Sequence, residues 1–322
     1  MNKRIVIIAL ILLSGITACS DGDPAPQPVA ETTVRLAGAI GQSTRGVIDS
    51  GYEKELAVSF ARQDESSVSA GSYGAWGVHQ AVRQGGAGNR PIDFAELQPY
   101  SPDGGTVWLH GVYPAVAEDA SGIRTGKAVF TVDGMTDIMA TGLLTATCYV
   151  PVRTCTFRHL LTQVRPVCYS NCSEEWGAVV KIEAEDVHTR QELDYGEAAP
   201  LLNDISSDTD IRNIAVQEIA GLSLPEVEEG AGLPEAQGYI LLPVSPVNGT
   251  AEHPLHLRVT TTKDGRGNAV ETVSRVAVTV EGGLQAGKRH IVSLFFTGGS
   301  KIETTSVSIE QWADRDAGEM PL

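Results

Sequence analysis

Apolar and polar residues alternate in short stretches along most of the chain, with a repeat of two residues. The clearest stretches are Phe157–Val164, Ala178–Glu185, Leu255–Thr262 and Thr272–Val280. A repeat of two is typical of a β-strand with one buried face. Asp264-Gly265 stands between the last two stretches and predicts a β-hairpin. No helical repeat extends far enough to compete, so the pattern predicts an all-β protein.

Weaker strand patterns fill the rest of the chain. They are Thr32–Ala39, Glu55–Arg62, Thr106–Pro114, Lys127–Asp133, Tyr239–Pro243, Arg289–Thr297 and Thr304–Trp312. Ser66–Asn89, rich in Gly, Ser and Ala, predicts a long loop or short ribbon, and Ala198–Ala220 predicts a loop with a helical turn. With 322 residues, the chain has room for two domains. We expect two tandem β-sandwiches, residues 32–147 and 148–322, joined within Thr136–Cys172.

The N-terminus predicts a lipoprotein signal peptide over residues 1–18. Lys3-Arg4 precede the apolar run Ile5–Leu13, which is too short to span a bilayer as a mature helix. Ile16-Thr17-Ala18-Cys19 reads as a lipobox, in which the Cys19 thiol receives a diacylglycerol. The alternative is an ordinary signal peptide that happens to end near a cysteine. Lipidation at Cys19 predicts an outer-membrane lipoprotein anchored by lipid.

The linker, residues 19–31, and the overall charge refine this prediction. Ser20–Asp23 resembles the acidic export tag that sends some lipoproteins to the outer face of the outer membrane, and three prolines make the following segment a stiff spacer. The formal net charge of the whole chain is −16. Nucleic acid and anionic lipid both need basic surfaces, so we expect neither to be bound through charge.

The four cysteines after Cys19 cluster in the middle of the chain. They are Cys148, Cys155, Cys168 and Cys172. Their spacing contains no Cys-x-x-Cys pair, and an exported chain reaches an oxidising compartment, so disulfides are a better prediction than a zinc site. Cys148–Cys155 together with Cys168–Cys172 is one possible pairing, and Cys155–Cys168 across neighbouring strands is another. The spacing leaves the choice open.

Motifs for catalysis or cofactor binding are missing from the sequence. Gly282–Lys288 has the spacing of a phosphate-binding loop, but Arg289 follows where Ser or Thr is needed, and the segment joins two predicted strands. We interpret it as a turn. His159 alternates with apolar residues and reads as a core histidine. Since neither Gly-x-Ser-x-Gly nor His-Glu-x-x-His occurs, we expect no enzyme activity, no cofactor and no metal.

Several motifs, in this order, resemble the fimbrillin family, the lipoprotein subunits of type V pili. They are Asp137-Ile138-Met139-Ala140, Phe157-x-His159-Leu160-x-x-Gln163-Val164, Tyr239-Ile-Leu-Leu-Pro243, Gly283-Leu284-x-x-Gly287-Lys288-x-x-Ile291-x-x-Leu294 and Val307-x-Ile309-x-x-Trp312. The resemblance implies two transthyretin-like β-sandwich domains. The chain departs from the family at His290, where an aromatic is common, and in its cysteine cluster.

The resemblance also implies a mode of assembly. In such pili a trypsin-like protease cuts after an arginine behind the first strand, and Arg45-Gly46 matches that position. Loss of the first strand, which carries Val34 and Leu36, would open a groove that the extended terminal segment of another subunit fills. The alternative is that Arg45 is a surface arginine and the strand stays. Thr304–Trp312 is the candidate donor segment, or else the last strand of its own domain, in a subunit that caps or anchors.

These observations leave two functions open. The first is a structural or adhesive subunit of a type V-like pilus, with other pilus subunits as partners in a homo- or hetero-polymer and a host or bacterial surface molecule as ligand. Its place as stalk, tip or anchor is undecided. The second is a monomeric, surface glycan-binding lipoprotein in which Trp76, Tyr73 and Trp108 stack on sugars. The alternative for these aromatics is packing in the core.

Overall fold

A computed structural model of the chain describes residues 30–41, 48–65, 76–117, 126–228, 232–247 and 249–311. The described residues are nearly all β, as predicted; the helical elements among them are the single turn α1 (Ser173–Trp176) and the 3-10 turn η3 (Asp208–Asp210). Within these ranges no helix is both long and apolar enough to cross a membrane. The predicted signal peptide, including Cys19, lies outside the described residues.

The first sheet closes into a barrel. Its strands are β1 (Leu36–Ile40), β2 (Leu56–Asp64), β3 (Gly77–Arg83), β4 (Arg90–Phe94), β5 (Val107–Tyr113), β7 (Met139–Ala140), β8 (Leu144–Ala146) and β9 (Thr154–His159). The order is β2-β3-β4-β1-β9-β7-β5-β8, and β2 also pairs with β5. That last pairing makes a ring of seven strands, with β8 attached to β5.

The barrel corrects the sandwich predicted for the N-terminal half. Alternation along a strand shows that one face is buried, but a sandwich and a barrel both produce this pattern. The difference lies in the pairing of β2 with β5, which join residues about 50 positions apart, such as Ser59 with Val112. No local pattern encodes such a pairing. Closure removes the free edges that an open sheet would expose.

The remaining strands form three sheets. The first contains, in order, β16 (Ile240–Leu242), β10 (Thr162–Ser170), β19 (Lys288–Thr297) and β20 (Lys301–Gln311). The second contains β14 (Ile211–Ala215), β11 (Ala178–His188), β17 (Leu255–Thr261) and β18 (Thr272–Val278), and β15 (Leu222–Ser223) also pairs with β11. The third contains β13 (Leu202–Asp204), β12 (Arg190–Asp194) and β6 (Lys127–Thr131). Buried side chains from the first two, such as Leu294 and Val259, share one apolar cluster. The predicted hairpin at Asp264-Gly265 is confirmed as β17–β18.

The junction differs from the prediction. Phe157–Val164 is not one strand, because β9 ends at His159 and β10 begins at Thr162. Leu160 and Leu161, between them, are both buried, which breaks the alternation. β9 pairs with β1, so strands before and after residue 148 share the barrel. The boundary between residues 147 and 148 stays a prediction.

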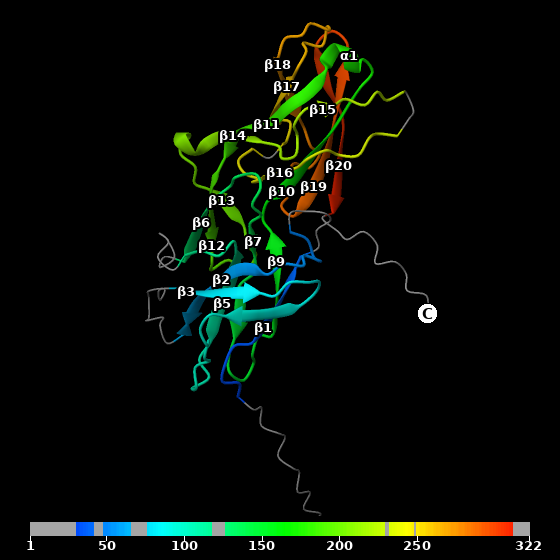
Figure 1. The fold of residues 1–322 in the computed structure, drawn as a ribbon. Coiled ribbons are helices and arrows are strands. Elements are labelled where there is room, and N and C mark those ends of the chain that lie inside the picture. Colours follow the sequence, from blue (N-terminus) through cyan, green and yellow to red (C-terminus); the bar gives the residue numbers. More distant parts are fainter. Residues whose placement is uncertain are drawn as a thin grey trace, which may run out of the picture. The chain divides into compact units, whose positions relative to one another are not determined.

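Two segments predicted with little regular structure contain short elements. β3 lies in Ser66–Asn89, which was predicted as a long loop or short ribbon, and Ala198–Ala220 contains the predicted helical turn, η3, together with β13 and β14. β13 and β14 were missed because short strands that pair with distant partners carry little local signal. At the C-terminus, β19 (orange) and β20 (red) run side by side in Figure 1, joined by ten paired positions from Lys288–Gln311 to Thr297–Lys301.

Candidate assembly site at the first strand

The first strand lies inside the barrel wall. β1 pairs antiparallel with β4 on one side and parallel with β9 on the other. Its alternate residues Leu36 and Ile40, together with Val34 just before the strand, belong to the barrel core and are only 4–6% exposed. A half-buried strand is thus confirmed in this stretch, but it covers Leu36–Ile40 and not Thr32–Ala39. Removing β1 would separate β4 from β9 and uncover an apolar groove.

Main-chain hydrogen bonds hold the segment along its whole length, beyond the strand itself. They join Glu31 N to Cys148 O (2.8 Å), Val34 N to Gln98 O (2.8 Å), Ala37 N to Arg153 O (2.8 Å) and Gly41 N to Phe157 O (2.7 Å). Glu31 also forms an ion pair with Arg153. Each buried amide that loses its partner costs free energy, so the groove would need another extended chain to satisfy these groups.

Gly38 sits where the strand passes closest to the core. A Cβ atom at this position would lie 2.9 Å from Ile92 Cδ1 and 3.3 Å from Phe157 Cε2. Such distances leave no room for a branched side chain without displacing both neighbours. The glycine thus lies between the two larger inward residues Leu36 and Ile40, and gives the groove a narrow point.

Arg83, at the end of β3, contacts the main chain of β1. Its side chain is fully buried, and its Nε donates to the carbonyl oxygen of Gly38 at 2.9 Å. Three further bonds run from the guanidinium nitrogens to the carbonyls of Gln84, Gly86 and Gly88. Burial lowers the pKa of Arg83 from its ordinary value. Without β1, the Nε–H of a buried guanidinium would lose its acceptor.

His159 and Asp137 close the other end of the site. The His159 side chain lies 2.5 Å from Asp137 by its Nδ1, both side chains are almost fully buried, and its Nε2 lies 3.4 Å from the Gly41 carbonyl oxygen. His159 is thus a core histidine, as predicted. The pair also links the two halves of the junction motif, since Ile138 and Leu160 bond through their main chains.

The predicted processing site adjoins this strand in sequence. Arg45 and Gly46 lie between the described residues Gly41 and Ile48, and outside the described ranges. Cleavage there therefore stays a prediction. The structure does place Val34 and Leu36, the residues predicted on the exchanged strand, in the barrel core.

The predicted disulfides are absent from the structure. Cys148, Cys155, Cys168 and Cys172 are all free thiols. Cys148 and Cys155 belong to the barrel core, whereas Cys168 belongs to the other apolar cluster, so the Cys155–Cys168 pairing joined residues of two different cores. Burial raises the pKa of Cys155 and of Cys168 to about 12. Thiols of this kind pack as small apolar groups and react slowly.

The candidate donor segment is the last strand of its own sheet. β20 pairs with β19 alone and forms the edge of the four-stranded sheet. Tyr169 Oη on β10 contacts Thr305 Oγ1 at 2.8 Å, and Arg289 on β19 lies 3.4 Å from Glu310. Most β20 side chains are exposed or half-buried. Trp312, at the end of the predicted donor segment, lies outside the described residues.

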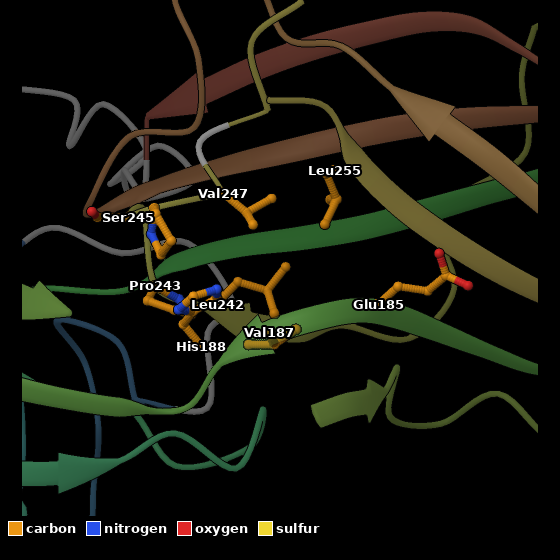
Figure 2. A pocket seen from close by; sticks show the side chains of 9 residues that line it. Glu185, Val187, His188, Leu242, Pro243, Ser245, Val247 and Leu255 are labelled. Carbon is orange, nitrogen blue, oxygen red and sulfur yellow. The ribbon is translucent and has the colours of Figure 1, made fainter. Parts of the chain in front are cut away.

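The predicted sugar-stacking platform does not form as a surface. Trp76 is buried and its ring centroid lies 5.7 Å from that of Tyr195, while Trp108 is partly buried against the same core. Tyr73 lies outside the described residues. A small pocket lies elsewhere, among β11, β17 and the segment after β16, and its lining is mostly apolar (Figure 2). At about 10 Å³ it is barely large enough for one water molecule.

Metal-binding clusters are likewise missing from the described part of the chain, where no three His, Cys, Asp or Glu residues gather. Three of the residues that shape the site were not identified from sequence: Gly38, Arg83 and Asp137 in its pairing with His159. Only Gly38 had a local signal, as a glycine between small residues inside a strand pattern. The partners of Arg83 and Asp137 are 45 and 22 residues away.

Several solved structures have the same fold as this chain. A protein from Bacteroides uniformis, described provisionally as a cell adhesion protein, matches 87% of this chain and 98% of its own with a TM-score of 0.55 and 14% identity. A second, from Bacteroides ovatus, matches 89% and 100%, with a TM-score of 0.56 and 14% identity. A third, from Parabacteroides distasonis, matches 89% and 98%, with a TM-score of 0.50 and 8% identity. The chain has the fold of these bacterial proteins.

The match to this fold extends over almost the whole of each neighbour. No protein-family model matches the sequence, and no curated protein matches it significantly. At 8–14% identity the similarity concerns the path of the chain and not the residues of a site. Any function must therefore be argued from this chain's own residues.

Proposed function

We propose that this protein is a fimbrillin-like subunit of a type V-like pilus, exported as a lipoprotein through Cys19 to the outer membrane and cell surface. Assembly then follows cleavage after Arg45, release of β1, and entry of an extended segment from another subunit. The fold shared with bacterial proteins provisionally assigned to cell adhesion supports an adhesive role. No catalytic or cofactor role enters the proposal.

One observation carries it: β1 is a short terminal strand that occupies an interior position of a closed barrel. Such a strand is joined to the rest of the chain through residues 42–47 on one side and the N-terminal linker on the other. Its release would expose two strand edges and the pockets of Val34, Leu36 and Ile40 together. Main-chain pairing plus alternate side-chain pockets is the arrangement by which an added strand binds tightly and in one register.

The glycan-binding alternative gains no support, since Trp76 is a core residue. A surface ligand for the assembled pilus remains part of the proposal.

The decisive experiment is to determine the N-terminal residue of the protein recovered from native cell surfaces. We expect a population that begins at Gly46, and we expect Arg45→Ala to abolish it while Arg62→Ala, a change at another arginine, leaves it. Detergent-resistant ladders should disappear with the same variant. Should every molecule begin at lipidated Cys19 while the pilus still assembles, strand removal would be refuted.

A further inference from the structure

The groove under β1 has a specific shape, which can be compared with the chain's own terminal strand. The side chains of β1 that fill the groove are large, absent and large in turn, at Leu36, Gly38 and Ile40. Ile92 and Phe157 crowd the middle position at 2.9 and 3.3 Å from a notional Cβ. Any strand that replaces β1 therefore needs aliphatic residues two positions to either side of a glycine or alanine.

Register cannot slip to avoid this narrow point. Arg83 Nε requires a carbonyl oxygen where Gly38 presents one, and its other bonds go to carbonyls of residues 84–88, which hold the guanidinium in place. Arg83 is fully buried, so water cannot take over the bond. A shift by one residue would also turn the inward side chains outward. A shift by two residues would present another carbonyl to Arg83, but it would bring Leu36 or Ile40 to the position that Ile92 and Phe157 crowd. The small residue must therefore occupy the position of Gly38.

β20 does not meet this requirement. The strand Lys301–Gln311 contains neither glycine nor alanine. In no register does it place aliphatic residues both two positions before and two positions after one residue, because the residues four positions after Ile302, Val307 and Ile309 are Ser306, Gln311 and Ala313. The required pattern reads the same in both directions along a strand, so β20 does not meet it in either the parallel or the antiparallel orientation. Residues 312–322 include Ala313, Ala317 and Gly318, and each has a polar or charged residue two positions away.

Forcing β20 into the groove would place hydroxyl or carboxylate groups in an apolar barrel. With Ser308 at the narrow point, for example, Glu310 would take one of the two aliphatic pockets. An unpaired buried charge of this kind is strongly unfavourable. Self-assembly through this pairing is therefore disfavoured by the sequence of the strand itself.

We infer, on the basis of the function proposed above, that the groove accepts an extended segment of a different protein, with the pattern aliphatic-x-(Gly or Ala)-x-aliphatic, and rejects the terminal strand of an identical chain. The subunit then joins a hetero-assembly and does not polymerise with itself by this route. The space at Gly38 sets this specificity, and Arg83 holds whichever strand enters by its bond to a main-chain carbonyl oxygen at that position.

The test uses the full chain with a site-specific protease sequence in place of residues 42–47. After cleavage, β1 is displaced under mild denaturant, and labelled peptides are added while fluorescence anisotropy is recorded. The peptides are residues 30–41, the same peptide with Gly38→Val, the same with Ala39→Val, and residues 301–312. Ala39 is the matched control, since it lies next to Gly38 on the opposite face of β1.

We expect the native peptide and the Ala39→Val peptide to bind alike, and the Gly38→Val peptide to bind at least about tenfold more weakly because it overpacks the core. The peptide of residues 301–312 should be weaker still. Equal binding of residues 30–41 and 301–312, or of the native and Gly38→Val peptides, would overturn the inference and leave strand exchange intact. If even the native peptide fails to rebind, the proposed function fails, and the inference fails with it.

Discussion

The two terminal strands of the molecule, β1 and β20, occupy opposite kinds of position. β1 has five residues, two neighbours and a fully apolar inner face, whereas β20 has eleven residues, one neighbour and mostly exposed side chains. The shorter strand is therefore the more deeply integrated. Length is a poor guide to how much a strand contributes, because buried apolar area and satisfied main-chain groups count for more.

This difference has a consequence for assembly. Taking β20 away would uncover one edge of one sheet, but taking β1 away would open a closed barrel and expose its core. A groove with apolar pockets on both sides is a binding site, whereas an edge with polar, half-exposed side chains offers mainly main-chain bonds. The comparison thus places the candidate acceptor at β1.

The largest expected effect comes from truncating one side chain in each strand. Leu36→Ala in β1 should lower the free energy of unfolding by about 2–5 kcal/mol, because it leaves a cavity in the barrel core. Ile309→Ala in β20, where the side chain is 42% exposed, should cost about 0.5 kcal/mol or less. Denaturant unfolding of the full chain measures both. Equal losses would break the comparison.

The second prediction concerns the loss of stability at acid pH, to which one buried histidine in each region contributes. His110 on β5 and His290 on β19 are fully buried, and burial lowers the pKa of each from 6.5 to about 4. The unfolded chain therefore takes up these protons first. The stability contribution is complete above pH 6.5 and is lost as the pH falls from 6.5 towards 4, by about 3 kcal/mol for each fully shifted histidine.

The measurement is the free energy of unfolding at pH 7 and at pH 5 for the native chain, His110→Gln and His290→Gln. Each variant should show a smaller difference between the two pH values, whatever its absolute stability. If only His110→Gln reduced the difference, the surroundings of His290 on β19 would be more hydrated than those of His110, whose ring lies against Tyr195. A native chain equally stable at both pH values would contradict the prediction for both regions.

The smallest effect concerns the charge that links β20 to its neighbour. Glu310→Gln removes the ion pair with Arg289, in which Glu310 is about half exposed. Such pairs contribute about 0–1 kcal/mol, and high salt should abolish the difference between the variant and the native chain. Thermal unfolding at low and high salt tests this. A loss that persists at high salt would indicate that β20 is held more firmly than its exposure suggests.

Prediction from sequence succeeded where the signal was local. The strands at Glu55–Arg62, Lys127–Asp133 and Leu255–Thr262 each appear as predicted within a few residues, because alternation is a property of the strand itself. His159 was correctly interpreted as a core residue for the same reason. The predicted disulfides do not appear in the structure, where Cys148, Cys155, Cys168 and Cys172 are free. Spacing does not show which core a cysteine enters, and Cys155 and Cys168 enter different ones.

The candidate site was likewise predictable where the signal was local and not where it depended on distant residues. Val34 and Leu36 were predicted on the exchanged strand, and both side chains lie in the barrel core, in the pockets that release of the strand would expose. Arg83 could not be assigned a role, since its acceptor at Gly38 lies 45 residues earlier in the chain and across β4. The closure of the barrel depends likewise on β2 meeting β5 as well as β3.

The sequence by itself determined the all-β character of the protein, the apolar alternation of its first strand and the absence of a glycine or alanine in its last. These are local properties, set by the side chains and by the two-residue repeat of a strand. Only the tertiary structure decided that the first strand lies between two others in a closed barrel, that the Ile92 side chain crowds Gly38, and that Arg83 donates to the Gly38 carbonyl oxygen. Those facts depend on residues brought together from distant parts of the chain, where packing and main-chain pairing select one arrangement among many with the same local pattern.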